Sequence, residues 1–354
     1  MYDAPASPNQ HDFAPQNRRL LDAKSILVTG GTGSFGGRFV HRVLERYNPK
    51  KLIIFSRDEL KQFEMRQALS EVFPQEKMDR LRFFLGDVRD RDRLELAFRG
   101  VDLVIHAAAL KQVPAAEYNP SECIHTNILG AENVVRACLS NGVKKVVALS
   151  TDKACSPINL YGATKLASDK TFVAANNLSG DIGTRFSVVR YGNVAGSRGS
   201  VGPFFQRLLD RGAKELPITD ERMTRFWITL DQGVSFVLSC IEMMRGGEVF
   251  VPKIPASTVM ELAQAMAPGM PTRIVGIRPG EKLHEAMISI DDARQTVDLG
   301  DRFAIEPDFV EYPRTSFVKD GVGVKVPENF AYTSDTAERL DGPGMLALLD
   351  ACHA

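Results

Sequence analysis

Short runs of consecutive apolar residues alternate with helical patterns through the first half of the chain. The runs predicted as strands are residues 25–29, 51–55, 81–85, 103–106, 146–149 and 186–190. The intervening helices are predicted at residues 34–47, 59–72, 120–140 and 157–176. Strands that are apolar at successive positions are typical of a parallel sheet covered on both faces. The pattern therefore predicts an α/β fold with a doubly wound parallel sheet.

The second half of the chain lacks this regular alternation of strands and helices, because Gly and Pro recur and the predicted elements are shorter. Helices are predicted at about residues 203–211, 232–244 and 258–267. We expect residues 23–195 to form the nucleotide-binding domain. Residues 196–354 are then mostly a smaller C-terminal α/β substrate-binding lobe, with some segments packing back on the first domain. The polar residues 1–22, rich in Pro, Asn and Gln, are expected to form a flexible N-terminal arm.

Composition narrows the function classes. Lys+Arg and Asp+Glu both number 44 in the 354 residues, so no basic excess is available to neutralise nucleic-acid phosphates. No apolar run approaches the roughly 20 residues of a membrane span, and the N-terminus lacks a signal-peptide core. The five cysteines show no paired spacing, which favours reduced thiols in the cytoplasm and no metal site.

A Gly-rich turn follows the first predicted strand and opens the first helix. It reads Thr29-Gly30-Gly31-Thr32-Gly33-Ser34-Phe35-Gly36. Gly30 allows the tight turn, Gly33 lets a pyrophosphate approach the backbone, and Gly36 allows close packing of helix on strand. Because the turn lies within a βαβ pattern, it predicts a Rossmann-type dinucleotide site, with the phosphates at the helix N-terminus.

The end of the second strand bears on which dinucleotide binds. It reads Phe55-Ser56-Arg57-Asp58, and Lys61 follows on the helix. Arg57 can bind the 2′-phosphate of the cofactor ribose through two N–H groups, and Lys61 can add a second positive charge. We therefore expect NADP as the cofactor. Asp58 opposes this, but it also suits a helix N-cap. The alternative is a solvated charged turn.

Two further segments are placed to contact the cofactor. Asp87 and Val88 follow the third strand, where Asp87 can reach the adenine amino group. A helix cap is an equally good interpretation of Asp87. Ala107, after the fourth strand, lets the backbone pass beneath the cofactor.

Tyr161 and Lys165 lie one helical turn apart on one face of a predicted helix. The Lys165 charge can lower the Tyr161 pKa, so that a phenolate takes a proton from a sugar hydroxyl as hydride leaves. Thr151, Asp152 and Lys153 end the fifth strand at the same edge of the sheet. Thr151 can hydrogen-bond the reacting hydroxyl. Asp152 and Lys153 add the acid and base that an elimination of water needs, unless they form only a surface ion pair.

Several stretches together resemble one family. They are Ala107-Ala-Ala-Leu-Lys-Gln-Val-Pro114, Ser150-Thr-Asp-Lys-Ala154, Pro157-Ile-Asn-Leu-Tyr-Gly-Ala-Thr-Lys165, Arg190-Tyr-Gly-Asn-Val194 and Gly276-Ile-Arg-Pro-Gly-Glu-Lys-Leu-His-Glu285. The chain is similar over about residues 25–294 to the inverting UDP-N-acetylglucosamine 4,6-dehydratases, which are extended short-chain dehydrogenases/reductases. The resemblance implies NADP as cofactor, UDP-N-acetylglucosamine as substrate, and a product that enters pseudaminic acid synthesis for flagellin or surface glycosylation.

The resemblance also implies a role for each catalytic residue. Tyr161 begins at the 4-hydroxyl, Lys165 also holds the nicotinamide ribose, Lys153 removes the C5 proton and Asp152 protonates the leaving 6-hydroxyl. As a base, Lys153 needs a pKa lowered by burial or by the positive charge of Lys165 or of the oxidised nicotinamide, and Asp152 opposes this lowering.

Substrate contacts are expected from Lys111, Asn193, Arg198, Arg278 and Glu281. By likeness, Arg278 binds the diphosphate and Glu281 the uridine ribose hydroxyls, and the alternative is an Arg278–Glu281 ion pair within a turn. Trp227 and Phe226 are predicted to fill the core between the two lobes rather than stack on uracil.

Two other functions remain open at this stage. A nucleotide-sugar 4-epimerase uses the same Tyr161 and Lys165 but does not require Asp152 and Lys153. A non-catalytic NADP-sensing protein tends to lose the Tyr–Lys pair, which this chain has kept. The resemblance also implies a homo-oligomer, either a dimer or a trimer of dimers, that pairs through the helices at residues 120–140 and 157–176.

Overall fold

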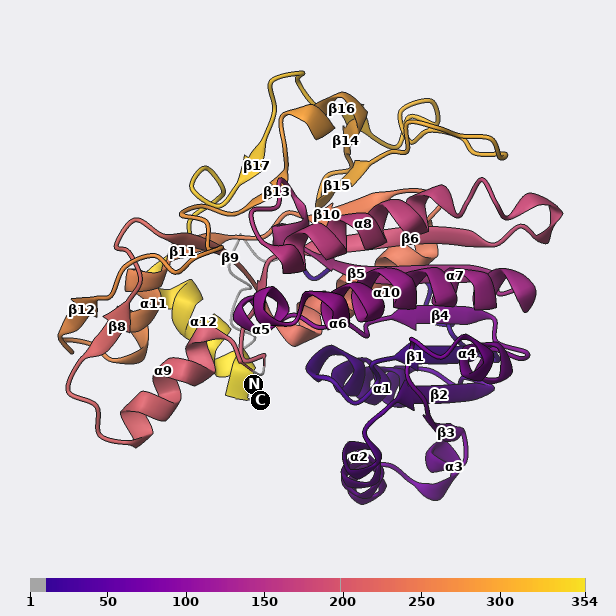
Figure 1. Cartoon of the computed structure of the whole chain (residues 1–354), viewed down its shortest axis with the longest axis horizontal. Coiled ribbons are helices and arrows are strands. Elements are labelled where there is room, and N and C mark those ends of the chain that lie inside the picture. The colour runs from indigo at the N-terminus through magenta and orange to yellow at the C-terminus, as the bar shows by residue number, and fades with distance from the viewer. Residues whose placement is uncertain (1–10, 198, 354) are drawn as a thin grey trace.

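The computed structural model describes residues 11–197 and 199–353, and one large sheet organises them (Figure 1). Its strands are β1 (Ser25–Thr29), β2 (Lys51–Ser56), β3 (Leu81–Leu85), β4 (Leu103–His106), β5 (Lys145–Thr151), β6 (Arg185–Tyr191), β10 (Val249–Pro252), β14 (Thr296–Asp298), β15 (Arg302–Ile305) and β16 (Val324–Lys325). Their order across the sheet is β16-β14-β15-β10-β6-β5-β4-β1-β2-β3.

The strands from β3 to β10 run parallel, whereas β15, β14 and β16 continue the sheet with antiparallel pairs. β1 lies between β2 and β4, so the strand order reverses there. The predicted doubly wound parallel sheet is confirmed. In such a sheet, ligands bind at the carboxyl ends of the strands near this reversal.

Helices cover both faces of the sheet. On one face lie α1 (Ser34–Arg46) and α10 (Leu230–Met243), and on the other lie α4 (Arg91–Ala97), α7 (Gly130–Ser140) and α8 (Leu160–Ala174). Successive strand residues point to opposite faces. In β1, Ile26 and Val28 therefore pack in the core with α1, whereas Leu27 packs in the core with α7 and α8. Double-sided burial explains the continuous apolar runs. Helices α2 (Glu59–Val72) and α3 (Gln75–Met78) follow β2.

The helix expected over residues 120–140 contains a π turn. It consists of α6 (Pro120–Ile124), the π segment η1 (His125–Leu129) and α7, and α5 (Val113–Tyr118) precedes it. Asn127 lies inside the π turn. Its side chain accepts from Leu110 N–H at 2.8 Å, donates to Leu110 C=O at 2.9 Å and donates to Thr164 Oγ1 at 3.0 Å. The π turn therefore ties the loop after β4 to α8.

A separate lobe is built from the second half of the chain, on the left of Figure 1. It contains α9 (Val201–Asp210), β8 (Leu216–Ile218), α11 (Val259–Met266), β12 (Thr272–Ile274) and α12 (Gly342–His353), with a core that includes Phe205, Leu262 and Met345. A small sheet of β7 (Asn193–Val194), β9 (Thr224–Ile228) and β11 (Ala256–Thr258) joins this lobe to the large sheet. β13 (Ala286–Ile288) pairs with β17 (Tyr332–Thr333). Residues 196–354 thus supply both the lobe and several strands of the large sheet.

Residues 11–22, the described part of the segment predicted as an arm, lie against α10. Phe13 is buried, and its ring centroid is 5.0 Å from that of Phe236. The backbone N–H groups of Gln16 and Asn17 donate to the Glu242 carboxylate at 2.8 and 3.0 Å. An aromatic anchor and two charge-assisted hydrogen bonds therefore hold this segment.

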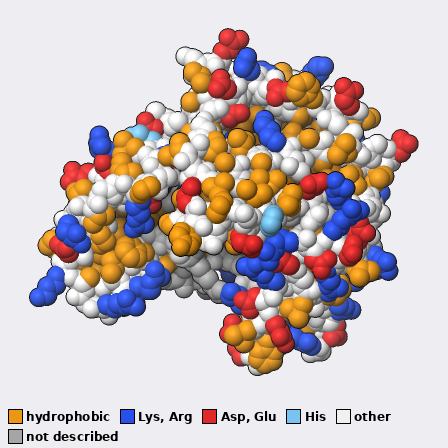
Figure 2. Space-filling view, viewed as in Figure 1, with side chains coloured by type: hydrophobic (Ala, Val, Ile, Leu, Met, Phe, Trp, Pro, Cys, Tyr) orange, Lys and Arg blue, Asp and Glu red, His pale blue; other side chains and the backbone are white. Residues whose placement is uncertain are grey.

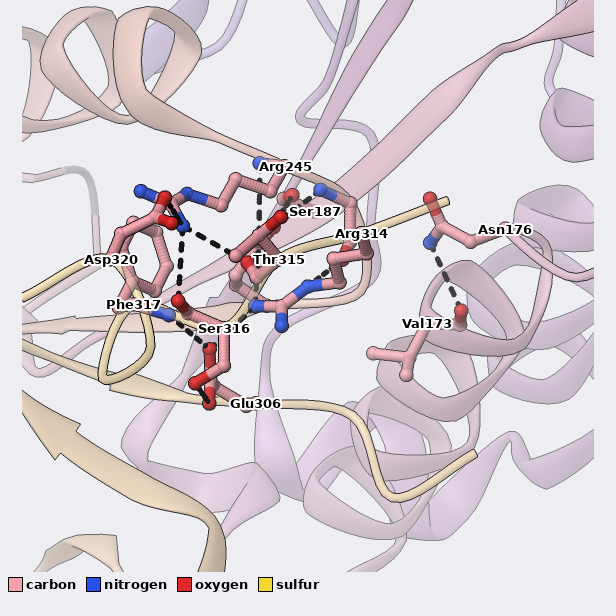
Figure 3. A network of polar contacts seen from close by, with 12 residues as sticks. Val173, Asn176, Ser187, Arg245, Glu306, Arg314, Thr315, Ser316, Phe317 and Asp320 are labelled. Atoms are coloured by element: carbon pink, nitrogen blue, oxygen red, sulfur yellow. Dashed lines mark hydrogen bonds and ion pairs between the residues drawn. The ribbon is translucent and has the colours of Figure 1, made fainter. Parts of the chain in front are cut away.

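A buried ionic network ties the segment after β15 to the rest of the sheet (Figure 3). Glu248 is fully buried, accepts from Ser187 Oγ at 2.6 Å and pairs with Arg314 at 3.3 Å. Arg314 also pairs with Glu306 at 2.9 Å. Because Glu248 directly precedes β10, the network lies at the amino-terminal edge of the sheet, away from the edge where ligands bind. Its role is to hold the fold together.

Candidate active site

A cavity of about 800 Å³ opens at the carboxyl edge of the parallel strands, between the sheet and the lobe. The face drawn in Figure 2 is hollowed between these two parts. Most of the sequence-predicted site residues line the cavity. They are Gly30, Thr32, Gly33, Ser34, Phe35, Gly36, Lys61, Ala107, Lys111, Thr151, Asp152, Lys153, Tyr161, Lys165, Asn193, Arg278 and Glu281. Ser56, Arg57, Asp87 and Val88 are not among its lining residues, and Arg198 lies outside the described part of the chain.

The Gly-rich turn has the geometry expected of a dinucleotide loop. Gly30 adopts φ +65°, and a Cβ there would lie 2.8 Å from Ala108 N. A Cβ on Gly36 would lie 2.6 Å from Gly31 Cα, so any side chain there would push α1 off the turn. Gly33 is the N-cap of α1 and has no side chain to occupy the helix N-terminus. This helix end can therefore face an anionic group.

After the ends of β2 and β3, basic and acidic side chains form ion pairs with one another. Asp58 caps α2 as predicted, accepting from Lys61 N–H at 3.0 Å, and it pairs with Lys61 Nζ at 2.8 Å. Arg57 Nη1 lies 3.6 Å from Asp87 Oδ2, and the Arg57 side chain is 59% exposed. The cap of α4 is Asp90, so the interpretation of Asp87 as a helix cap is wrong. Arg57 and Lys61 are thus exposed basic side chains that are each paired with a carboxylate in this structure.

Tyr161 and Lys165 lie on the first turns of α8, which begins after the Asn159 cap. Lys165 Nζ donates to Leu149 C=O at 2.7 Å, which fixes it beneath the cavity, and burial lowers its pKa. Burial raises the pKa of Tyr161 to about 12, while the Lys153 charge and a hydrogen bond with Thr151 oppose that rise. In this structure the Lys153 charge, and not that of Lys165, is the positive charge that lowers the Tyr161 pKa.

Asp152 and Lys153 do not form a solvated surface ion pair. The Asp152 side chain is 1% exposed, and its Oδ1 accepts from Thr151 Oγ1 at 2.8 Å and from Lys153 Nζ at 3.0 Å. A second carboxylate, Glu285 Oε1, lies 3.4 Å from the same Nζ. Burial alone would lower the pKa of Lys153, but the Asp152 and Glu285 charges outweigh it and raise that pKa. The expected lowering is therefore wrong for the resting site, because sequence alone counted one carboxylate and the fold brings two.

Sequence reasoning missed several residues around this pair. Glu285, just before β13, and Arg225, in β9, both line the cavity, and Arg225 Nε lies 3.8 Å from Glu285 Oε1. An arginine directly before the apolar run at residues 226–228 of a buried strand was the available signal for Arg225. Asp169 accepts from Ser150 Oγ at 2.7 Å and faces Lys165. It follows Lys165 by four residues, so helical spacing could have found it.

Behind the cofactor loop, a buried histidine contributes no charge. His106 Nδ1 and Thr29 Oγ1 are hydrogen-bonded at 2.8 Å, and burial lowers the His106 pKa to about 3. The imidazole therefore remains neutral at physiological pH and holds the ends of β1 and β4 together.

In the loop before β13, Arg278 Nη1 and Glu281 Oε1 lie 3.7 Å apart. Asn159 Nδ2 donates to Gly280 C=O at 2.7 Å and so ties this loop to the start of α8. The ion pair named as the alternative is thus present, and both of its members still line the cavity. Trp227 is buried and donates to Ser257 Oγ at 2.8 Å, which confirms its place in the core.

No helix in the described part of the chain is long and apolar enough to cross a membrane. No group of three or more His, Cys, Asp or Glu side chains there is arranged to hold a metal ion.

Comparison with known proteins identifies relatives that cover most of the chain. Residues 26–307 match the family described as "Polysaccharide biosynthesis protein". A protein of Campylobacter jejuni named "UDP-N-acetylglucosamine 4,6-dehydratase (inverting)" is 59% identical over 320 residues, which are 89% of this chain and 94% of that protein.

Two further similarities extend the comparison. A "UDP-glucose 4-epimerase" of Rickettsia canadensis is 43% identical over 325 residues, 90% of this chain and 93% of that protein. The solved structure of Pen from Bacillus thuringiensis is similar with a TM-score of 0.82 at 32% identity, covering 94% of this chain and 98% of that one.

Proposed function

This chain belongs to the polysaccharide biosynthesis protein family that includes the inverting UDP-N-acetylglucosamine 4,6-dehydratases, and on that premise we propose that it catalyses the C5-inverting 4,6-dehydration of UDP-N-acetylglucosamine. The product is UDP-2-acetamido-2,6-dideoxy-β-L-arabino-hexos-4-ulose. One observation carries the choice over 4-epimerisation: a buried acid and base, Asp152 and Lys153, stand beside Tyr161 in the same cavity. Moving hydride on and off C4 needs no such pair, whereas eliminating water does.

We propose NADP as the cofactor. The cavity fits a nicotinamide dinucleotide. The glycines of the Gly30–Gly36 turn carry no side chains, so a pyrophosphate can contact the backbone of the turn at the N-terminus of α1. Arg57 and Lys61 would hold a 2′-phosphate, and Lys165 would lie under the nicotinamide ribose. Such a cofactor would supply redox chemistry, by which a hydride could leave C4 of the sugar and later be returned at C6.

The protein side chains handle the protons. Tyr161, once ionised to the phenolate, takes the 4-hydroxyl proton as C4 is oxidised, and the resulting ketone makes the C5 hydrogen acidic. Lys153 removes that proton, and Asp152 protonates the 6-hydroxyl as the C6–O bond breaks and water leaves. A proton delivered to C5 from the opposite face inverts that centre. Two protons leave the sugar, one enters the departing water and one returns to C5. The side chains therefore regain their starting protonation states at the end of the cycle.

The contact between Asp152 and Lys153 suggests how one residue could become the acid and the other the base. In the resting site, Nζ of Lys153 holds the proton, since the neighbouring Asp152 and Glu285 charges raise the Lys153 pKa. Moving one proton across the 3.0 Å contact from Nζ to Oδ1 produces the amine base and the carboxylic acid at once. Thr151 donates to Asp152 and is also hydrogen-bonded to Tyr161, so it fixes the acid in place relative to the tyrosine.

Substrate contacts are proposed from the cavity lining. Lys111 and Asn193 would face the sugar, Arg278 would supply positive charge for the diphosphate, and Glu281 would accept from the uridine ribose. Arg198, which lies outside the described residues, is proposed from the sequence alone as a second positive charge for the diphosphate. The product is proposed to enter pseudaminic acid synthesis in the cytoplasm, where the thiols of Cys123, Cys138, Cys155 and Cys240 would stay reduced.

The decisive experiment is mass spectrometry of the product formed from UDP-N-acetylglucosamine in deuterated water. A dehydratase yields a sugar that has lost one water and carries deuterium at C5. An epimerase yields a product of unchanged composition with no deuterium at C5, and a non-catalytic protein yields no product. Either of the last two results would overturn the proposal.

A further inference from the structure

Glu285 stands next to the reacting pair, yet the proton steps above do not use it. Its side chain is 2% exposed, lines the cavity and approaches Lys153 Nζ to 3.4 Å from a segment far along the chain. Asp152 approaches the same Nζ to 3.0 Å from the end of β5. The Lys153 ammonium is therefore held between two buried carboxylates that come from different parts of the fold.

The backbone around Glu285 is fixed on both sides. Its N–H donates to Ser334 Oγ at 2.9 Å, and its C=O accepts from Ser334 N–H at 2.8 Å. Ser334 is itself fully buried and hydrogen-bonded to Thr224 Oγ1 at 2.6 Å. A carboxylate on such a support has little freedom to move away from Lys153, so its position is a built feature of the site.

The two carboxylates also retain unused bonding capacity. Within the described structure, Glu285 Oε2 and Asp152 Oδ2 are buried without a hydrogen-bond partner. An unsatisfied buried carboxylate oxygen costs free energy, so its retention in a cavity points to a ligand that supplies the missing donor. Sugar hydroxyls are such donors. A hydroxyl that bonds Oε2 would draw negative charge away from Nζ and ease the loss of its proton.

We propose that Glu285 is a positioning residue of the dehydration site: its buried carboxylate holds the Lys153 ammonium beside Asp152 and keeps the proton on Nζ in the resting enzyme. The inference rests on the proposed dehydratase function. Other charged or titratable groups acting on Lys153 come from separate elements: Arg225 on β9, Lys111 after β4 and Tyr161 on α8. Arg225 opposes Glu285, since its charge lowers the Lys153 pKa.

The first test reads the Lys153 proton directly and needs no turnover. The protein as purified is treated with acetic anhydride at a series of pH values, and acetylation of Lys153 is measured by peptide mass spectrometry. The Glu285→Gln variant removes the charge and keeps the shape, so the midpoint of labelling should fall by about one pH unit or more. Glu285→Asp, which keeps the charge, should restore most of the wild-type midpoint.

Glu306→Gln is the matched control, because it also neutralises a buried, hydrogen-bonded glutamate, but in the network of Figure 3 and away from the cavity. It should lower the melting temperature and leave the Lys153 labelling midpoint unchanged. An equal midpoint in wild type and Glu285→Gln, with both proteins folded by circular dichroism, would overturn the inference.

The second test connects the pairing to catalysis. In Glu285→Gln, the limb of the kcat–pH profile set by Lys153 should move to lower pH, in the same direction as the labelling midpoint, and KM should change less than kcat. If the labelling midpoint moves and the profile does not, Glu285 still controls the Lys153 proton, and the proposed role of Lys153 as the base is what fails.

Discussion

Tyr161 and Lys153 are proposed to act at different points of one reaction, so their variants should stop at different points. Lys153→Ala should still oxidise C4 and reduce bound NADP, seen as NADPH absorbance, but should release roughly 10²–10⁴-fold less dehydrated product. It should also exchange little deuterium into C5. Near-native dehydration by this variant would show that another group is the base, with Tyr161 acting twice as the leading alternative.

Tyr161→Phe is the partner variant for that experiment. It removes the phenol that takes the 4-hydroxyl proton, so it should show no NADPH absorbance at all. A Tyr161→Phe protein that reduces its cofactor as fast as wild type would place the first proton transfer on a different residue.

The preference for NADP over NAD is also expected to depend on individual side chains. Replacing Arg57 and Lys61 together by Ala removes two charge-assisted contacts to a 2′-phosphate, which should reduce the preference for NADP over NAD about tenfold or more. Dissociation constants for both dinucleotides, measured by calorimetry, check this. Arg66→Ala, a charge removal on the exposed side of α2, is the control and should leave the ratio unchanged. Wild-type protein that binds NAD more tightly would contradict the assignment.

At the level of elements, the contact between residues 11–22 and α10 should matter for stability rather than for chemistry. Phe13→Ala empties a site beside Phe236, and burial of this kind is worth about 3–5 kcal/mol of unfolding free energy. Turnover per folded active site should be unchanged, since no described residue before Gly30 lines the cavity. Urea unfolding and kcat measure the two quantities separately.

Phe309→Ala provides the comparison for that variant, because the Phe309 side chain is 82% exposed and its removal should have little effect on stability. Truncation up to residue 22 should resemble Phe13→Ala, with lower stability and normal turnover. A large loss of kcat in a truncated protein that remains folded would mean that the segment takes part in the active site.

Across the whole molecule, acid should weaken the network that holds the segment after β15. Burial alone would raise the pKa of Glu306, but hydrogen bonds from Phe317 N–H and Ser316 Oγ and the charge of Arg314 outweigh it and lower that pKa. A lowered folded pKa adds stability above the usual value near 4.3, and this stability is lost as the pH falls through that range. Wild type should therefore lose melting temperature below about pH 5 more steeply than Glu306→Gln does.

The assembly of whole chains is a further prediction. Apolar side chains gather over α5, α6 and α8 on the face in Figure 2. In these elements and just before α8, Tyr118 of α5 is 89% exposed and Ile158 is 56% exposed. Covering them in a homo-oligomer would remove that surface from water. Light scattering at micromolar concentration should give the mass of a dimer or of a trimer of dimers, and Tyr118→Glu should shift it toward the monomer. A wild-type monomer would contradict this.

The sequence by itself determined whatever depends on near neighbours in the chain. The Gly30–Gly36 turn, the Asp58 cap and the Tyr161–Lys165 spacing are local, and continuous apolar runs indicated a sheet covered on both faces. Only the tertiary structure decided how charges from distant segments combine. Glu285 and Arg225 reach Lys153 through the packing of β9 and β13 against the end of β5, and no spacing rule relates positions so far apart. A pKa depends on every charge within a few ångströms, so the direction of the Lys153 shift followed from the fold and could not follow from the order of residues.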